Sequence, residues 1–125
     1  MKRILCVDDN QNLLDIYEII LVAEGYTVMT SIFPENMFKL ISEFEPHLII
    51  LDINMNEING LDVCKEVKSY INNKNTPVII ISSDESIHTA ICDFNATAII
   101  LKPFEINDLT SAVKLHLSQT STFSR

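Results

Sequence analysis

The sequence predicts an α/β fold, a doubly wound five-stranded parallel sheet with helices on both faces. Short runs rich in β-branched aliphatic residues alternate along the chain with segments whose apolar residues recur at helical spacing. The runs are apolar from end to end, which is typical of parallel strands buried on both faces. A length of 125 residues with 47% hydrophobic content is typical of one domain with one substantial core.

The strands are predicted where these aliphatic runs occur. Each run has the length of a strand, and β-branched side chains fit a pleated backbone. In chain order the predicted strands span residues 3–7, 27–32, 47–51, 77–81 and 98–101.

The helices are predicted between the strands, where the apolar spacing changes from continuous to about 3.6 residues. They lie within residues 13–24, 37–44, 61–71, 87–94 and 106–117. The apolar residues that define them are, in order, Leu13, Tyr17 and Ile20; Met37, Leu40, Ile41 and Phe44; Leu61, Cys64, Val67 and Ile71; Ile87, Ile91 and Phe94; and Ile106, Leu109, Val113 and Leu117. The folded domain is expected to cover residues 1–118, followed by a frayed polar tail at 119–125.

Charge and composition restrict the classes of function. Seventeen acidic against nine basic residues give a net charge of −8 without a basic stripe, so direct nucleic-acid binding is not expected. No run approaches the roughly 18 apolar residues of a membrane span, so a cytoplasmic protein without membrane contact is expected. Cys6, Cys64 and Cys92 are widely separated among aliphatic residues, which favours buried thiols over a disulfide or zinc site.

Polar residues that could form a site follow four of the five predicted strands. In a parallel sheet all strands point the same way, and ligands bind at their carboxyl ends. The first strand is followed by Asp8 and Asp9, the third by Asp52, the fourth by Ser82 and the fifth by Lys102. If these strands are neighbours, three carboxylates, a hydroxyl and an ammonium share one pocket.

Helix capping is the alternative explanation for most of these residues. Asp and Ser side chains accept the free N–H groups at helix starts, and taken singly the acids and Ser82 fit that role. Capping gives no reason for Lys102. Carboxylates about 4 Å apart repel by about 4 kcal/mol at an effective dielectric near 20, so a cluster of them requires cations. Lys102 supplies one cation, and Mg²⁺, which prefers oxygen ligands, would supply the other.

In combination these motifs resemble the receiver domains of two-component response regulators, chemotaxis-regulator-like proteins with a flavodoxin-like (βα)5 fold. The motifs are Asp8-Asp9, Asp52 after Leu-Ile-Ile-Leu, Gly60 eight residues later, Ser82 after Val78-Ile-Ile-Ile, and Lys102-Pro103-Phe104. The resemblance covers nearly the whole chain. It implies a signalling protein rather than a general enzyme, one that catalyses only its own phosphoryl transfer and dephosphorylation.

The resemblance also implies a role for each acidic residue and a set of partners. Asp52 would accept a phosphoryl group from a sensor histidine kinase or a histidine phosphotransfer protein. Asp9, Asp52 and the backbone carbonyl of Asn54 would bind Mg²⁺, and Asp8 would hold a metal-bound water. A downstream effector protein or domain would then respond to the phosphorylated state.

The chemistry of phosphoryl transfer accounts for these residue types. The reaction needs an oxygen nucleophile in line with the leaving group and positive charge on the equatorial oxygens. Asp52 supplies the nucleophile, and Mg²⁺ and Lys102 supply the charge. Under the resemblance, the Ser82 hydroxyl donates to the phosphoryl oxygens and Lys102 pairs with them.

Four positions depart from the pattern of the resembled family. Asn56 replaces a usual proline, Asn95 a usual glycine and Ile99 a usual aromatic residue. Ser83 adds a second hydroxyl directly after Ser82. Ile99 has no ring, and β-branched residues are stiff at their first torsion. Phosphorylation is therefore expected to perturb residues 82–90 more than the Ile99 side chain.

Three other functions fit part of the pattern. A flavodoxin-like cofactor binder would need a Gly-, Ser- and Thr-rich phosphate loop, whereas Asp8-Asp9-Asn10 would repel a phosphate. A hydrolase with Asp52 as covalent nucleophile would need a capping insertion, for which 125 residues leave little room. The third is a degenerate receiver that acts only as a binding module, which would not require the acids, the hydroxyl and the lysine together.

Overall fold

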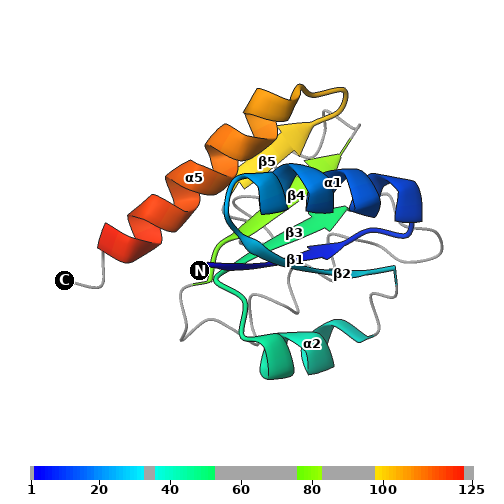
Figure 1. The fold of residues 1–125 in the computed structure, drawn as a ribbon, viewed down its shortest axis with the longest axis vertical. Helices are drawn as coiled ribbons and strands as arrows, with labels where there is room; N and C mark the ends of the chain where they lie inside the picture. Colours follow the sequence, from blue (N-terminus) through cyan, green and yellow to red (C-terminus); the bar gives the residue numbers. More distant parts are fainter. Residues whose placement is uncertain (1, 33–35, 53–75, 83–97, 123–125) are drawn as a thin grey trace.

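A computed structural model of the protein describes residues 2–32, 36–52, 76–82 and 98–122. Within these ranges the chain forms a five-stranded parallel sheet with helices on both faces (Figure 1). The predicted fold class is therefore confirmed. The helices predicted within 61–71 and 87–94 lie outside the described residues.

The sheet has the strand order β2-β1-β3-β4-β5, with every pairing parallel. Its strands are β1 (Arg3–Val7), β2 (Thr27–Ser31), β3 (Leu48–Asp52), β4 (Val78–Ser82) and β5 (Ala98–Leu101). Strands β3 and β4 are buried at every residue, because each has neighbours on both sides and β2 and β5 form the edges. The direction of winding reverses between β1 and β3, which is where sheets of this kind bind ligands.

Two hydrophobic clusters cover the two faces of the sheet. Helices α1 (Gln11–Ala23) and α5 (Ile106–Thr122) pack on one face and α2 (Met37–Phe44) on the other (Figure 1). Alternate strand residues point to opposite faces: Ile4, Cys6, Leu48, Ile50, Ile79, Ile81 and Ile100 lie under α1 and α5, and Leu5, Val7, Ile49, Leu51, Val78 and Ile80 lie with α2. The same alternation assigns each strand-end residue to a face.

Both ends of helix α1 are closed by local hydrogen bonds. Oδ1 of Asn10 accepts the backbone N–H of Asn12 at 3.0 Å and of Leu13 at 3.3 Å. At the other end the N–H of Gly25 donates to the carbonyl of Val22 at 3.0 Å. Gly25 has φ of +97°, a conformation that residues with a Cβ rarely adopt, so the turn into β2 favours glycine.

Three of the five strands have boundaries one residue away from the predicted ones: β2 at its end, and β3 and β4 at both ends. Strands β3 and β4 include Asp52 and Ser82, because the parallel ladder continues with Asp52 opposite Ile81 and Ser82 opposite Leu101. Strand β2 ends at Ser31, one residue before the predicted end. The polar residues expected just after two strands are thus held by the sheet itself.

Helix α5 is longer than predicted. It continues to Thr122, so residues 119–122, which were expected to belong to a frayed tail, are part of this helix. No Gly or Pro occurs between residues 106 and 122 to end the helix.

At the amino end of the sheet, Arg3 and His47 form a closed network. The N–H of Arg3 donates to Nδ1 of His47 at 2.9 Å, and the N–H of His47 donates to the carbonyl of Arg3 at 2.7 Å. The Arg3 Nε group donates to the carbonyls of Phe44 at 2.8 Å and Glu45 at 3.0 Å, which are free at the end of α2. This network fixes α2 to the sheet.

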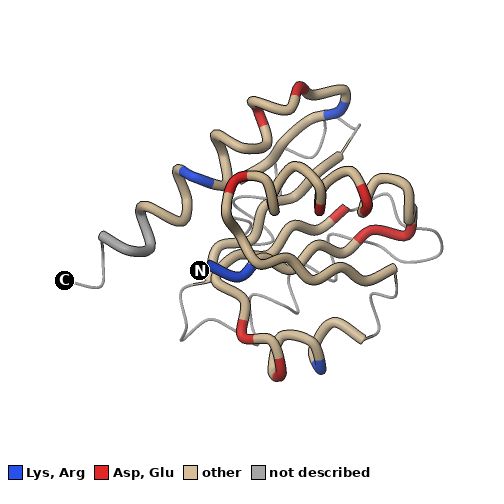
Figure 2. The backbone as a smooth tube through the Cα atoms, viewed as in Figure 1, with Lys and Arg blue, Asp and Glu red and all other residues tan. Residues whose placement is uncertain are grey.

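Acidic residues occur along α1 and at the carboxyl end of β1, as the red segments of the backbone in Figure 2 show. Helix α1 carries Asp15 and Glu18 but no Lys or Arg. Among the described residues, no helix has the length and apolar character needed to span a membrane. Cys6 is a buried free thiol, as predicted, and Cys64 and Cys92 lie outside the described residues.

Candidate functional site

Strand register and side-chain alternation place three of the predicted site residues together. Val7 is opposite Leu51, so Asp8 and Asp52 follow at the same level on adjacent strands. Every second residue of a strand points to the same face of the sheet. Counted in this way, both acids and Lys102 fall on the same face as the residues under α1 and α5. The edge of the sheet at this face therefore carries two acids and one ammonium.

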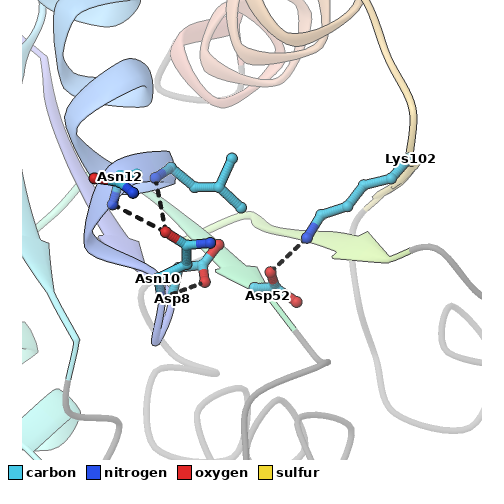
Figure 3. Close-up of polar contacts among 6 residues, drawn as sticks. Asp8, Asn10, Asn12, Asp52 and Lys102 are labelled. Atoms are coloured by element: carbon cyan, nitrogen blue, oxygen red, sulfur yellow. Dashed lines mark hydrogen bonds and ion pairs between the residues drawn. The ribbon is translucent and has the colours of Figure 1, made fainter.

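The central contact of the site is an ion pair between Lys102 and Asp52. Lys102 extends from the end of β5 to Asp52 (Figure 3), and its Nζ lies 2.7 Å from Oδ2 of Asp52. The carboxylate is almost fully buried, at 4% exposure, whereas the lysine side chain is 25% exposed. An ion pair with one buried partner is held in a defined geometry, and removal of the lysine would leave a buried charge without its cation.

Asp8 is the second buried acid, with 1% of its surface exposed. Burial, then the nearby Asp52 carboxylate, raise the pKa of Asp8 to about 7, although the Asn10 N–H and the Lys102 ammonium lower it. Oδ1 of Asp8 accepts the N–H of Asn10 at 2.9 Å (Figure 3), but Oδ2 is buried and has no hydrogen-bond partner within the described part of the chain. A buried carboxylate oxygen beside a second acid favours a proton or a metal ion.

Helix capping does not account for Asp8 and Asp9. The N-cap of α1 is Asn10, whose side chain bonds the first free N–H groups of the helix. Asp8 instead orients the turn by accepting the Asn10 N–H. Neither acid is therefore the N-cap residue of α1.

The predicted metal ligands are only partly brought together. Asp8 and Asp52 are adjacent, whereas Asp9 is exposed and Asn54 lies outside the described residues. Within the described ranges no three His, Cys, Asp or Glu side chains group closely enough to hold a metal ion. The orphan Oδ2 of Asp8 next to the Asp52 carboxylate nevertheless fits a hard divalent cation, because such ions take carboxylate oxygens.

Comparison with known proteins assigns the family. Residues 4–114 match the model of the response regulator receiver domain. The chain belongs to that family. It is therefore a receiver domain of two-component signalling, as its motifs indicated.

Individual relatives agree with this assignment. The receiver domain is 33% identical over 117 residues to the response regulator ArlR of Staphylococcus aureus, covering 91% of this chain and 52% of that protein. It thus spans about half the length of the curated relatives it matches. A putative response regulator from Chloroflexus aurantiacus superposes with a TM-score of 0.85 at 28% identity, over 94% of this chain and 98% of that one. The receiver domain protein of Methanospirillum hungatei, at 24% identity and a TM-score of 0.88 over 98% of each chain, shares the fold.

Ser82 occupies the same edge of the receiver domain but differs in direction. It is fully buried as the last residue of β4. By the alternation of side chains along a strand it lies on the same face as Val78 and Ile80, which is the α2 face. The N–H of Lys102 donates to the carbonyl of Ser82 at 2.7 Å, so the two residues are joined through the backbone. Ile99 lies on that α2 face as well.

Two features of this receiver domain were not predicted from its sequence. Asn10 was not identified as the helix cap, although an Asn directly before an apolar-periodic segment is a capping signal. The stacking of Tyr17 on Phe104 was also missed, because residues far apart in the chain give no local signal of contact. Tyr17 lies on the apolar face of its helix, as its spacing predicts, and also contacts Phe104.

Proposed function

We propose that the receiver domain accepts a phosphoryl group on Asp52 from a phosphohistidine and thereby changes its protein contacts. The observation that carries this proposal is the 2.7 Å ion pair between Lys102 Nζ and a buried Asp52 oxygen at the carboxyl end of the sheet. A carboxylate held at a rigid strand end, with a cation already on it, is suited to in-line displacement at phosphorus. The proposed location is the cytoplasm.

The proposed transfer forms one bond and breaks one. An Asp52 oxygen bonds to phosphorus while the P–N bond to the donor imidazole breaks, and the imidazole nitrogen then takes a proton. The product is an acyl phosphate, which water can hydrolyse. The Lys102 ammonium moves from the carboxylate to the phosphoryl oxygens, and the Ser82 hydroxyl donates to them after turning from the α2 face.

Mg²⁺ belongs to this proposal as a bound cofactor. Asp8, Asp9, Asp52 and the carbonyl of Asn54 would hold it, Asp8 in part through water. When bound, the ion offsets the repulsion among the acids and the charge of the phosphoryl group. The orphan Oδ2 of Asp8 supports this assignment.

The exposed face of α1 is the proposed docking surface for the phosphohistidine donor. Ile16, Ile19 and Val22 are 49%, 71% and 52% exposed, and Asp15 and Glu18 lie beside them. Because α1 has no basic residue, this face complements a partner helix with apolar residues flanked by Lys or Arg. The helix begins just after the acidic site, so a partner seated here can reach Asp52.

Mass measurement of the intact protein tests phosphoryl acceptance. The parent is incubated with acetyl phosphate and Mg²⁺, and one added phosphoryl group is expected. Asp52→Asn should remain unlabelled, and the matched control Asp15→Asn, an exposed acid on α1, should be labelled as the parent is. If the parent is not labelled, the proposal fails and the binding-module function becomes the better one.

Docking is tested with protein donors. A panel of autophosphorylated histidine kinases is first screened with the parent, and the fastest donor is kept. Ile19→Glu is expected to slow transfer from that donor by about tenfold, the effect of about 1.4 kcal/mol, and to leave labelling by acetyl phosphate unchanged. An equal loss with both donors would place the defect at Asp52 and exclude a docking role.

A further inference from the structure

Lys102 reaches Asp52 across an intervening strand. Lys102 follows the edge strand β5, Asp52 ends β3, and β4 lies between them, a separation of about 10 Å at the usual strand spacing. A lysine side chain is flexible and can take many rotamers. The 2.7 Å contact therefore depends on how the backbone around Lys102 is held.

The backbone is anchored on both sides of Lys102. On one side its own N–H donates to the carbonyl of Ser82 at 2.7 Å. On the other side Phe104, two residues later and half-buried, packs against the cluster under α1 and α5. There it stacks on Tyr17 of α1, with ring centroids 6.3 Å apart and an angle of 28° between the planes.

Tyr17 is a buried residue whose hydroxyl lies next to the acidic site. It is 2% exposed, and its hydroxyl has no hydrogen-bond partner among the described residues. Burial and the charges of Asp8 and Asp52 raise the pKa of Tyr17, so the hydroxyl stays protonated beside the acidic site. An unsatisfied buried hydroxyl is unfavourable, whereas the Tyr17 ring is stacked on Phe104.

We propose that Tyr17 and Phe104 are positioning residues for the phosphoryl-transfer site. Their stacked rings hold the segment after β5 against α1, so that the Lys102 ammonium rests on the Asp52 carboxylate. The pair lies on the α1 and α5 face, whereas Ile99 lies on the α2 face, so this role is separate from any movement of Ile99. The inference rests on the proposed function, because its effect on rate presupposes phosphorylation of Asp52.

Kinetics of labelling by acetyl phosphate with Mg²⁺ test the proposal. Tyr17→Leu and Phe104→Leu remove one ring each and should lower kcat by about tenfold or more with little change in KM, because a misplaced group costs up to about a hundredfold. Tyr17→Phe keeps the ring and should therefore have the parental kcat. Phe44→Leu, a half-buried aromatic on the α2 face, is the matched control that loses comparable packing and should keep the parental kcat.

A second measurement needs no phosphorylation. The side-chain ammonium signal of Lys102 in ¹⁵N NMR, identified by its loss in Lys102→Met, should be shifted by the ion pair in the parent and in Tyr17→Phe. It should move toward that of an exposed lysine in Tyr17→Leu and Phe104→Leu. If the parent is not labelled, the proposed function fails, and this signal still decides on positioning. Parental kcat and a parental Lys102 signal in the folded Leu variants would overturn the inference.

Discussion

The two ends of the sheet are built from the same strands but differ in how their polar groups are satisfied. At the amino end, Arg3 and His47 bond each other and the last carbonyls of α2. At the carboxyl end, Asp8 and Asp52 are buried side by side, and an oxygen of Asp8 has no partner among the described residues. One end consists of matched donors and acceptors, and the other keeps an excess of negative charge.

The difference separates stability from function. Natural proteins violate local rules of polar satisfaction chiefly at functional sites, where the rest of the fold offsets the cost. Here the central strands β3 and β4 are buried throughout and hold both ends rigidly. The amino end should therefore respond to mutation as ordinary structure, whereas changes at the carboxyl end should depend on Mg²⁺ and pH.

The largest effect on stability is expected when the cation at the carboxyl end is removed. Lys102→Met leaves Asp52 buried without its partner and should lower the free energy of unfolding of the metal-free protein by about 2–3 kcal/mol. This lies below the range for fully buried pairs because the lysine is 25% exposed. Urea unfolding in EDTA measures it.

The control for this prediction is Lys39→Met, which removes an exposed lysine from α2. Its free energy of unfolding should stay within about 0.5 kcal/mol of the parental value. Equal stabilities of Lys102→Met and the parent would show that the ion pair contributes nothing. The two ends would then differ less than their contacts indicate.

A change of opposite sign is expected when one of the two buried acids is neutralised. Asp8→Asn keeps an acceptor for the Asn10 N–H but removes a charge, so it should stabilise the metal-free protein by about 1–2 kcal/mol at pH 8. The same change should weaken Mg²⁺ binding, measured by calorimetry. Asp15→Asn, an exposed acid, should alter neither property, and a destabilised Asp8→Asn would contradict the repulsion at this site.

The effect of Asp8 should also depend on pH. Its pKa is raised from 3.8 to about 7, so the folded state binds the proton more tightly than the unfolded state. The stability that Asp8 contributes is fully present below pH 3.8 and is lost as the pH rises through 7. The gain in Asp8→Asn over the parent, both in EDTA, should therefore grow between pH 4 and 8, and a constant gain would refute the shift.

Much of the carboxyl end could be predicted from the sequence because it is encoded in single strands. The aliphatic run before Asp52 and the similar runs elsewhere in the chain predict parallel strands. In a parallel sheet the carboxyl ends of the strands lie at the same edge. That rule alone predicts that Asp8, Asp52 and Lys102 lie at the same edge of the sheet. Asp9 lies one residue further along the chain than Asp8 and is exposed.

Features that depend on contacts between distant segments could not be predicted. The stack of Tyr17 on Phe104 joins α1 to the segment after β5, and the Arg3 bonds to α2 join residues more than 40 positions apart. Neither pair has a spacing that periodicity can detect. The ends of the strands also could not be predicted. A polar residue such as Ser82 remains in its strand when a residue of the adjacent strand, here Leu101, pairs with it.

The smallest effect is expected at the amino end, with a pH dependence opposite to that of Asp8. Burial, then the charges of Arg3 and Lys2, lower the pKa of His47 from 6.5, and Nδ1 must be unprotonated to accept the Arg3 N–H. The folded state thus binds this proton less tightly than the unfolded state. The stability contributed by His47 is fully present above pH 6.5 and is lost as the pH falls through the lowered pKa. His47→Asn, whose Oδ1 can accept the same N–H without titrating, should lose this dependence and leave labelling of Asp52 unchanged. Urea unfolding of parent and variant between pH 5 and 8 measures it. If the free energy of unfolding of the parent does not fall relative to that of His47→Asn toward acid, protonation of His47 does not break the network, and the two ends of the sheet do not have opposite pH dependences.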